Sequence, residues 1–331
     1  MIARGVLSGL VVATICFGAA ATVLAQPSTR TPRVGFVALR SPDAECKPMP
    51  IEEAFFLGLR DVGYVVGQTI VVDLRCVTTD AQRAAVLNDF IRTRVDVIVV
   101  IPPAMALAAR NVTKTVPIVC GSCGDPVDNG LAVSLARPGT NVTGLASLSA
   151  ELIGKRVEIT RELLPGLRAM TVFVYPTNPG FRPTLNALDA AGRALGIEMR
   201  RIEIRTASDF EKAFQSAAAA GARAVLLQDD PINRVERARI AELGLKHRLP
   251  TFAGVTELAE AGALLAYAPD RSAMLRRAAI FVDKILKGAT PADLPFEQAT
   301  RWELTVNLRT AKALGMTMPA SLLLRADTVI E

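Results

Sequence analysis

The sequence predicts an α/β protein with two lobes, each built on a parallel β-sheet. Short apolar strands alternate with amphipathic helices along most of the chain, and the alternation occurs in two successive sets. The length of 331 residues also corresponds to about two domains. Because parallel strands joined through helices need right-handed crossovers, we expect each set to form a Rossmann-like lobe.

Residues 1–25 have the pattern of a signal peptide. Arg4 gives the charged start, residues 6–23 are apolar with many small side chains, and small residues up to Ala25 suit a signal peptidase. We expect cleavage before Gln26, although an uncleaved membrane anchor is the alternative. A cleaved leader predicts export, and in a Gram-negative cell the periplasm.

The first set of elements begins after this leader. Its strands are expected at residues 34–39, 70–74, 95–101 and 116–120. Its helices are expected at residues 51–62, at residues 81–93 and from Ala104 onward. The apolar spacing of Phe55 and Leu59 suits a buried face of the first of these helices, which Gly63 ends.

The second set begins at Met170. Its strands are expected at residues 170–175, 199–204, 224–228 and 251–253, and its helices at residues 183–195, 208–219 and 234–246. An apolar run at residues 264–267 is followed by a long helix, 272–286, and a last strand at 303–306.

Residues 121–144, GSCGDPVDNGLAVSLARPGTNVTG, form a turn-rich segment between the two sets. Glycine permits positive φ, proline fixes φ, and Asn and Asp bond neighbouring amides. This composition is typical of a shaped connection and not of a helix. We expect the chain to leave one lobe for the other here.

Three stretches carry a family resemblance. They are the segment just described, the run GLRDVGYVVGQTIVVDLR at residues 58–75, and the tail ELTVNLRTAKALGMTMPASLLLRADTVIE at residues 303–331. Together they resemble the substrate-binding proteins of ABC transporters, and more narrowly the tryptophan/tyrosine-type ABC substrate-binding family. The resemblance covers nearly all of the chain after the leader.

The resemblance implies the type I periplasmic binding protein fold, in which three segments form a hinge between the lobes. The N-terminal lobe would comprise residues 33–145 and 268–296, and the C-terminal lobe residues 146–267 and 297–331. The long helix would thus return to the first lobe, with crossings near Leu145, Ala268 and Glu297. The implied partners are a small-molecule solute and a permease in the inner membrane served by a separate ATPase subunit.

Composition argues against several other classes. The net charge of +6 is scattered without blocks of like charge, so no nucleic-acid partner is expected. The only histidine, His247, lies between Lys246 and Arg248, where we expect it to be solvated, and no Ser-His-Asp set or zinc cluster is apparent. No dinucleotide or P-loop motif occurs, so we expect no cofactor, no metal and no catalytic residue.

Four cysteines follow the leader. Cys46 comes after the first strand and Cys76 ends the second, and the carboxyl ends of neighbouring parallel strands meet, which favours a Cys46–Cys76 disulfide over free thiols. Cys120 and Cys123 have CxxC spacing without a second pair. A local bridge or two reduced thiols is expected there in preference to redox catalysis or metal binding.

Loops after the strands should form the ligand site, because ligands bind outside the carboxyl ends of strands in open parallel sheets. The candidate ligand-binding residues are Arg40, Ser41, Pro103, Ala104, Gly121, Ser122, Asp125, Tyr175, Asn178, Asp229, Asp230, Glu257 and Tyr267. Helices that begin after Pro102 and Asn178 also direct free amide hydrogens toward this cleft.

Each assigned role has a structural alternative. Arg40 suits a ligand carboxylate but is otherwise a solvated loop residue, and Asp229 and Asp230 suit an ammonium group but otherwise cap a turn or helix. Tyr175 and Tyr267 can cover an apolar ligand part or simply pack. Asp125 borders the ligand or only caps a turn.

These observations predict a monomeric periplasmic binding protein that closes its lobes on an amino acid or a related small carboxylate and delivers it to a permease. A ligand-sensing protein that reports to a membrane receptor is the first alternative. The second is a periplasmic enzyme, such as a racemase that uses Cys120 or Cys123 as acid or base. The identity of the ligand and the docking surface are left open.

Overall fold

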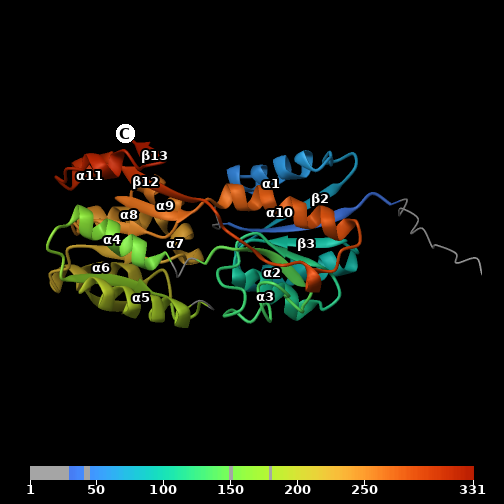
Figure 1. The fold of residues 1–331 in the computed structure, drawn as a ribbon, viewed down its shortest axis with the longest axis horizontal. Helices are drawn as coiled ribbons and strands as arrows, with labels where there is room; N and C mark the ends of the chain where they lie inside the picture. Colours follow the sequence, from blue (N-terminus) through green and yellow to red (C-terminus); the bar gives the residue numbers. More distant parts are fainter. Residues whose placement is uncertain (1–29, 41–44, 149–151, 179–180) are drawn as a thin grey trace, which may run out of the picture. The chain divides into compact units, whose positions relative to one another are not determined.

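Two β-sheets organise the chain, and helices cover both faces of each sheet (Figure 1). The computed structural model describes residues 30–40, 45–148, 152–178 and 181–331. Residues 32–331 form one unit, to which the following description applies. The expected signal peptide and Ser41 lie outside the described residues.

The first sheet has the strand order β11-β5-β4-β3-β1-β2, and all its pairings are parallel. Its strands are β1 (Arg33–Leu39), β2 (Val71–Val77), β3 (Val97–Val100), β4 (Ile118–Cys120), β5 (Val142–Ala146) and β11 (Glu297–Gln298). We call this sheet and its helices the first lobe. The helices are α1 (Pro50–Asp61), α2 (Asp80–Arg92), α3 (Pro103–Val112) and α10 (Arg271–Leu286), with a short 3₁₀ turn at Pro291–Asp293.

Alternating side chains of the first sheet enter two different cores. Phe36 of β1 packs with Phe55 of α1 and with α10, whereas the adjacent Val37 packs with Phe90 of α2 and with α3. Figure 1 shows the same division, with α1 and α10 side by side on one face and α2 and α3 on the other. The strands are therefore buried on both faces, as expected of a parallel sheet.

The second sheet has the order β13-β12-β10-β9-β8-β6-β7, and β12 runs antiparallel to β10. Its strands are β6 (Ala169–Val174), β7 (Glu198–Glu203), β8 (Val225–Leu227), β9 (Thr251–Ala253), β10 (Leu265–Pro269), β12 (Trp302–Asn307) and β13 (Thr328–Ile330). We call this sheet and its helices the second lobe. The helices are α4 (Ile153–Leu163), α5 (Phe181–Leu195), α6 (Asp209–Ala219), α7 (Pro231–Val235), α8 (Arg237–Lys246), α9 (Thr256–Ala261), α11 (Leu308–Ala313) and α12 (Ala320–Leu323).

The second sheet is also covered on both faces. Val172 and Val174 of β6 share a core with α4 and α5, while Phe173 between them packs against Phe210 and Phe214 of α6. The rings of Phe173 and Phe214 meet edge to face, with centroids 5.1 Å apart.

The chain passes between the sheets in three places, after β5, after β10 and after β11. Each strand continues one residue beyond the crossing expected at Leu145, Ala268 or Glu297. Glu297 pairs with Leu145 in the first sheet instead of opening the second lobe. The limits given for the two lobes as separate domains stay a prediction.

The turn-rich segment at residues 121–144 lies within the first lobe, which corrects the expectation that the chain changes lobes inside it. It connects β4 to β5, and its last residue, Gly144, pairs with Cys120 in the sheet. A side chain at Gly144 would place its Cβ 2.1 Å from the Cys120 carbonyl oxygen, and φ there is +139°. Only glycine fits this close pairing of β4 and β5.

Candidate functional site

The candidate site is a cavity of about 610 Å³ lined by residues of both lobes. Its walls come from loops and helix starts that follow β2, β3, β4 and β5 in the first lobe and β6, β7 and β8 in the second. This position, outside the carboxyl ends of parallel strands, is where open α/β sheets bind ligands.

The structure places eight of the thirteen predicted ligand residues on the cavity wall: Pro103, Ala104, Ser122, Asp125, Tyr175, Asn178, Asp229 and Asp230. Arg40, Gly121, Glu257 and Tyr267 are not among the lining residues. Several lining residues were not predicted, including Arg83, Asn129, Thr177, Arg205 and Gln228.

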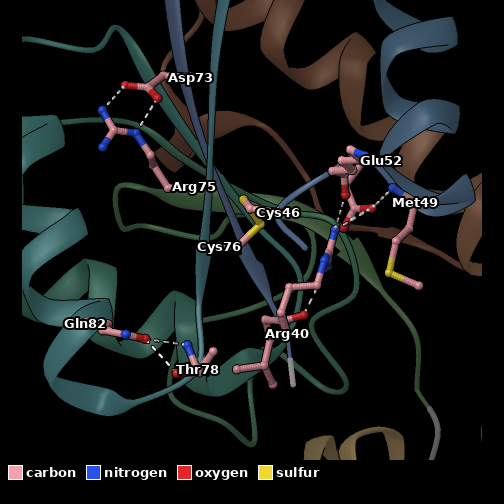
Figure 2. The surroundings of a disulfide bond; sticks show 11 residues. Arg40, Cys46, Met49, Glu52, Asp73, Arg75, Cys76, Thr78 and Gln82 are labelled. Carbon is pink, nitrogen blue, oxygen red and sulfur yellow. Dashed lines mark hydrogen bonds and ion pairs between the residues drawn. A yellow bond between two sulfur atoms is a disulfide. The ribbon is translucent and has the colours of Figure 1, made fainter. Parts of the chain in front are cut away.

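Arg40 lies within the first lobe, held by a buried ion pair. Its Nη2 is 3.1 Å from Oε2 of Glu52 on α1, and the two side chains are 6% and 0% exposed. Its guanidinium also donates to the carbonyl oxygens of Leu39 and Lys47, at 3.1 and 3.2 Å. Figure 2 shows Arg40 directed toward Glu52, which also accepts from the backbone N–H of Met49 at 2.8 Å. The predicted pairing of Arg40 with a ligand is therefore replaced by an internal partner.

A disulfide joins Cys46 to Cys76 beside this ion pair, the pairing that the sequence favoured (Figure 2). It attaches the chain after β1 to the end of edge strand β2, with Cα atoms 5.5 Å apart. The bridge thus holds one end of the loop that leads into α1.

A second disulfide joins Cys120 to Cys123. Of the two states expected for these cysteines, the structure has the local bridge and not the reduced thiols. Both cysteines are fully buried, and the bridge brackets Gly121 and the cavity residue Ser122. The backbone N–H of Cys123 donates to Leu145 of β5 at 2.9 Å. The bridge therefore fixes the first-lobe loop that lines the cavity.

Asp229 forms an ion pair with Arg234. Nη2 of Arg234 on α7 donates to Oδ1 of Asp229 at 2.5 Å, and Nε of Arg234 is 3.5 Å from Glu257 Oε1. Glu257 also accepts from Nη1 of Arg271, at 2.7 Å, where α10 begins. Burial raises the pKa of Glu257, but the charges of Arg271 and Arg234 outweigh it and lower that pKa to about 2. Glu257 is therefore paired with two arginines and does not line the cavity.

Arg156 on α4 is fully buried near these charged side chains. Burial lowers the pKa of Arg156 to about 10, and the charge of Asp229 opposes the decrease. Its Nε donates to the backbone carbonyl of Tyr267 at 2.8 Å. Tyr267 therefore contributes a backbone contact to this cluster and no side chain to the cavity wall.

Asp230 and Tyr175 line the cavity but have internal partners. Asp230 caps α7 by accepting from the backbone N–H of Ile232 at 3.0 Å, and it accepts from Nδ2 of Asn178 at 2.7 Å. Burial raises the pKa of Asp230. The hydroxyl of Tyr175 donates to Asn233 at 2.7 Å. At the cavity wall, Asp230 thus acts as a helix cap, and Tyr175 packs with its hydroxyl bonded to Asn233.

Asp125 caps a turn at the rim of the cavity. Its Oδ1 accepts from the backbone N–H groups of Val127 and Asp128, at 2.9 and 3.1 Å. Asn129 follows in the same turn, and its Nδ2 donates to the carbonyl oxygen of Cys123 at 2.9 Å. These bonds fold the polar turn back onto the loop bracketed by the second disulfide.

The described residues contain no group of three or more His, Cys, Asp or Glu side chains placed to hold a metal ion. In the same part of the chain, none of the helices combines the length and apolar character needed to span a bilayer. The cavity wall combines apolar residues with many polar and charged side chains that can form hydrogen bonds.

A family model described as ABC transporter substrate binding protein matches residues 50–330. The chain belongs to this family. This membership points to an extracytoplasmic ligand-binding protein. The match includes every strand of the two sheets except β1, and all residues that line the cavity.

Similar proteins agree with this membership. A tyrosine-binding protein of Clostridioides difficile is 26% identical over 267 residues, which are 80% of this chain and 76% of the relative. A conserved domain protein from Vibrio cholerae is similar in structure, with a TM-score of 0.82, 25% identity and coverage of 91% and 100% of the two chains. An ABC domain from Streptococcus pneumonia in complex with L-Trp gives a TM-score of 0.81, 19% identity and the same coverage. The fold of this substrate-binding protein is that of type I periplasmic binding proteins.

Proposed function

We propose that this chain is the extracytoplasmic binding subunit of an ABC importer, and that it delivers a small ligand to a membrane permease served by a separate ATPase subunit. The observation that carries this proposal is the cavity lined by both lobes. A ligand that contacts both walls favours the closed arrangement of the lobes, because it gains contacts there that the open arrangement lacks. A permease that recognises the closed form then receives only loaded protein.

The proposed ligand is an amino acid or a related small carboxylate. The cavity volume of about 610 Å³ lies within the range of small-molecule sites, about 300–1,000 Å³. Its wall combines apolar residues such as Leu148 and Ile204 with hydrogen-bond donors and acceptors. The names of a tyrosine-binding relative and of a neighbour in complex with L-Trp support the same class.

We further propose that residues 1–25 are removed on export and that the mature protein works in the periplasm as a monomer. The two disulfides support an oxidising compartment, because exported proteins keep such bonds whereas cytosolic reductants break them. The apolar, small-residue character of the leader supports its removal.

A thermal-shift screen of mature protein tests the ligand class. The probes are L-amino acids, aromatic carboxylates, small sugars, purines and polyamines. A ligand at a hundred times its Kd adds about 2.7 kcal/mol to the folded state, which is a readily measured rise in Tm. Ala104→Trp fills part of the cavity and should abolish the rise, while Asn111→Trp, at an exposed position of the same helix that does not line the cavity, serves as the control.

Stabilisation by an amino acid in wild type but not in Ala104→Trp is the expected result. Stabilisation by sugars alone contradicts the proposed ligand class. Chemical turnover of a probe without stabilisation contradicts the binding function. Uptake of the labelled ligand by cells with and without the protein then tests the transport role.

A further inference from the structure

We infer that two neutral amides, Asn129 and Gln228, recognise the ligand from opposite walls of the cavity. Asn129 accepts a hydrogen bond from a donor group of the ligand, and Gln228 donates one to an acceptor group. The inference rests on the proposed function and assigns the polar contacts within that same cavity. Neither residue stood out in the sequence.

Asn129 presents an acceptor whose orientation is fixed. Its Nδ2 donates to the carbonyl oxygen of Cys123 at 2.9 Å, which leaves Oδ1 as the remaining group of the side chain. The residue is 8% exposed and lines the cavity, and within the described ranges Oδ1 has no hydrogen-bond partner. A buried carbonyl oxygen without a donor is costly, so a ligand donor that reaches it gains an interaction that the wall itself does not supply.

Gln228 presents the complementary donor from the second lobe. It directly follows β8 and is 5% exposed, and its side-chain amide forms no hydrogen bond with any residue the structure describes. Its backbone carbonyl accepts from Nδ2 of Asn233 at 2.7 Å, so the position of the residue is fixed while its amide remains available. The Nε2 group is buried in the wall of the same cavity.

Two charged residues that the sequence suggested as ligand contacts are engaged elsewhere. Asp229 is paired with Arg234, and Arg40, outside the cavity wall, is paired with Glu52. Buried polar groups in native proteins are almost always satisfied, so two unsatisfied amides in one cavity indicate positions where a ligand completes the hydrogen bonding. The two amides therefore supply the direct hydrogen bonds to the ligand in this inference.

The two amides together fit a free amino acid. Its ammonium group donates to Oδ1 of Asn129, where the carboxylates of Asp125 and Asp128 in the same turn also line the cavity and favour a cation. Its carboxylate accepts from Nε2 of Gln228. Because the amides belong to different lobes, one ligand makes both bonds only when the walls approach it together.

The test is calorimetric titration of the mature protein with L-tryptophan, L-tyrosine, L-tryptophanamide and N-acetyl-L-tryptophan. Gln228→Glu keeps the shape but replaces the donor by a charged acceptor. We expect its affinity for the free amino acids to fall at least tenfold, while L-tryptophanamide, which lacks the carboxylate, is affected less. Gln298→Glu, the same change at an exposed site on β11, should bind as wild type does.

Asn129→Leu tests the first-lobe contact. It should weaken binding of L-tryptophan and reduce the preference for L-tryptophan over N-acetyl-L-tryptophan, which lacks the ammonium group. This change also removes the hydrogen bond to Cys123, so urea unfolding of each variant checks that the fold remains. The Gln228→Glu variant keeps that bond and therefore tests the recognition of the ligand without this complication.

Two outcomes overturn the inference, and they are distinguishable. If Gln228→Glu binds the amino acids as tightly as wild type, the assignment of the amides is wrong while the proposed function stands. If wild-type protein binds none of the four probes and no other amino acid stabilises it, the proposed ligand class fails and the inference fails with it.

Discussion

The hydroxyl of Tyr175 donates a 2.7 Å hydrogen bond to Oδ1 of Asn233, and Asn233 in turn donates through Nδ2 to the carbonyl oxygen of Gln228, also at 2.7 Å. These bonds connect the loop after β6 to the loop after β8 on the second-lobe wall of the cavity. Burial raises the pKa of Tyr175 well above its ordinary value, so the phenol is a neutral donor. The tyrosine is thus a structural link within the cavity wall.

Replacing Tyr175 by Phe should lower the free energy of unfolding by about 1–3 kcal/mol, because Oδ1 of the fully buried Asn233 then loses its donor. Urea unfolding measures the loss. Tyr267→Phe is the matched control, since the Tyr267 hydroxyl makes no hydrogen bond with the described residues, and it should change stability by much less. Equal effects of the two changes would contradict the structural role of Tyr175.

The two disulfides should respond differently to reductant. Cys46 is exposed and Cys76 is half-buried, whereas Cys120 and Cys123 are fully buried. Dithiothreitol added to folded protein should therefore reduce the Cys46–Cys76 bridge first. That bridge closes a loop with a sequence separation of 30 residues, so its loss should cost about 3–4 kcal/mol of stability.

Alkylation followed by mass spectrometry identifies the reduced cysteines, and urea unfolding of Cys46→Ser/Cys76→Ser measures the stability. Labelling of all four cysteines at one rate would contradict the difference in accessibility. Cys120→Ser/Cys123→Ser provides a background in which only the first bridge can react.

Glu257 should make the protein sensitive to acid. Its pKa of about 2 in the folded protein lies below its ordinary value, so its stabilising contribution is complete above a pH of about 4.5 and is lost as the pH falls toward about 2. The side chain is 32% exposed, and we allow for solvent screening by expecting Glu257→Gln to cost about 2 kcal/mol at neutral pH. The difference from wild type should shrink progressively below a pH of about 4.5.

Urea unfolding over a pH series checks this, with Glu260→Gln on the same helix as a control of opposite sign. Burial and the charge of Glu257 raise the pKa of Glu260, so its ionised form does not stabilise the fold at neutral pH and its removal should not destabilise. A pH-independent cost of Glu257→Gln would show that the carboxylate acts through packing alone.

Periodicity predicted most of the architecture because the strands and helices that carry it have strong apolar patterns. The strand at Thr251–Ala253 was predicted to the residue, and α10 to within one residue at its start. β5 was missed because Thr143 and Gly144 read as part of a turn. α4 was missed because Arg156 and Thr160 occupy buried positions of the helix, which masks its apolar face.

The position of a cavity at the strand ends could be predicted from the sequence, but the pairing of the charged side chains around it could not. Glu52 pairs with Arg40 across a loop and Arg234 pairs with Asp229, and both pairings depend on side-chain geometry that spacing does not encode. Asn129 and Gln228 were overlooked for the converse reason. Whether a buried amide lacks a hydrogen-bond partner can be judged only from the positions of all the side chains and backbone groups around it.

Close packing of α10 on α1 leads to a last prediction, because this contact returns the chain to the first lobe after β10. A Cβ on Gly58 of α1 would lie 2.1 Å from the carbonyl oxygen of Arg276 and 2.9 Å from Cβ of Ala279. Gly58→Ala should therefore push the helices apart and cost on the order of 3 kcal/mol.

The matched change is Gly154→Ala on α4, where a Cβ meets no described atom within 4 Å. Alanine is the better helix former, so this variant should gain up to about 1 kcal/mol. Urea unfolding of both variants measures the contrast. Neither glycine has a positive φ, so backbone strain does not distinguish the two positions. Equal effects of the two changes would mean that helix propensity, and not the approach of α10, determines the residue at position 58. The contact between α1 and α10 would then be looser than the structure has it.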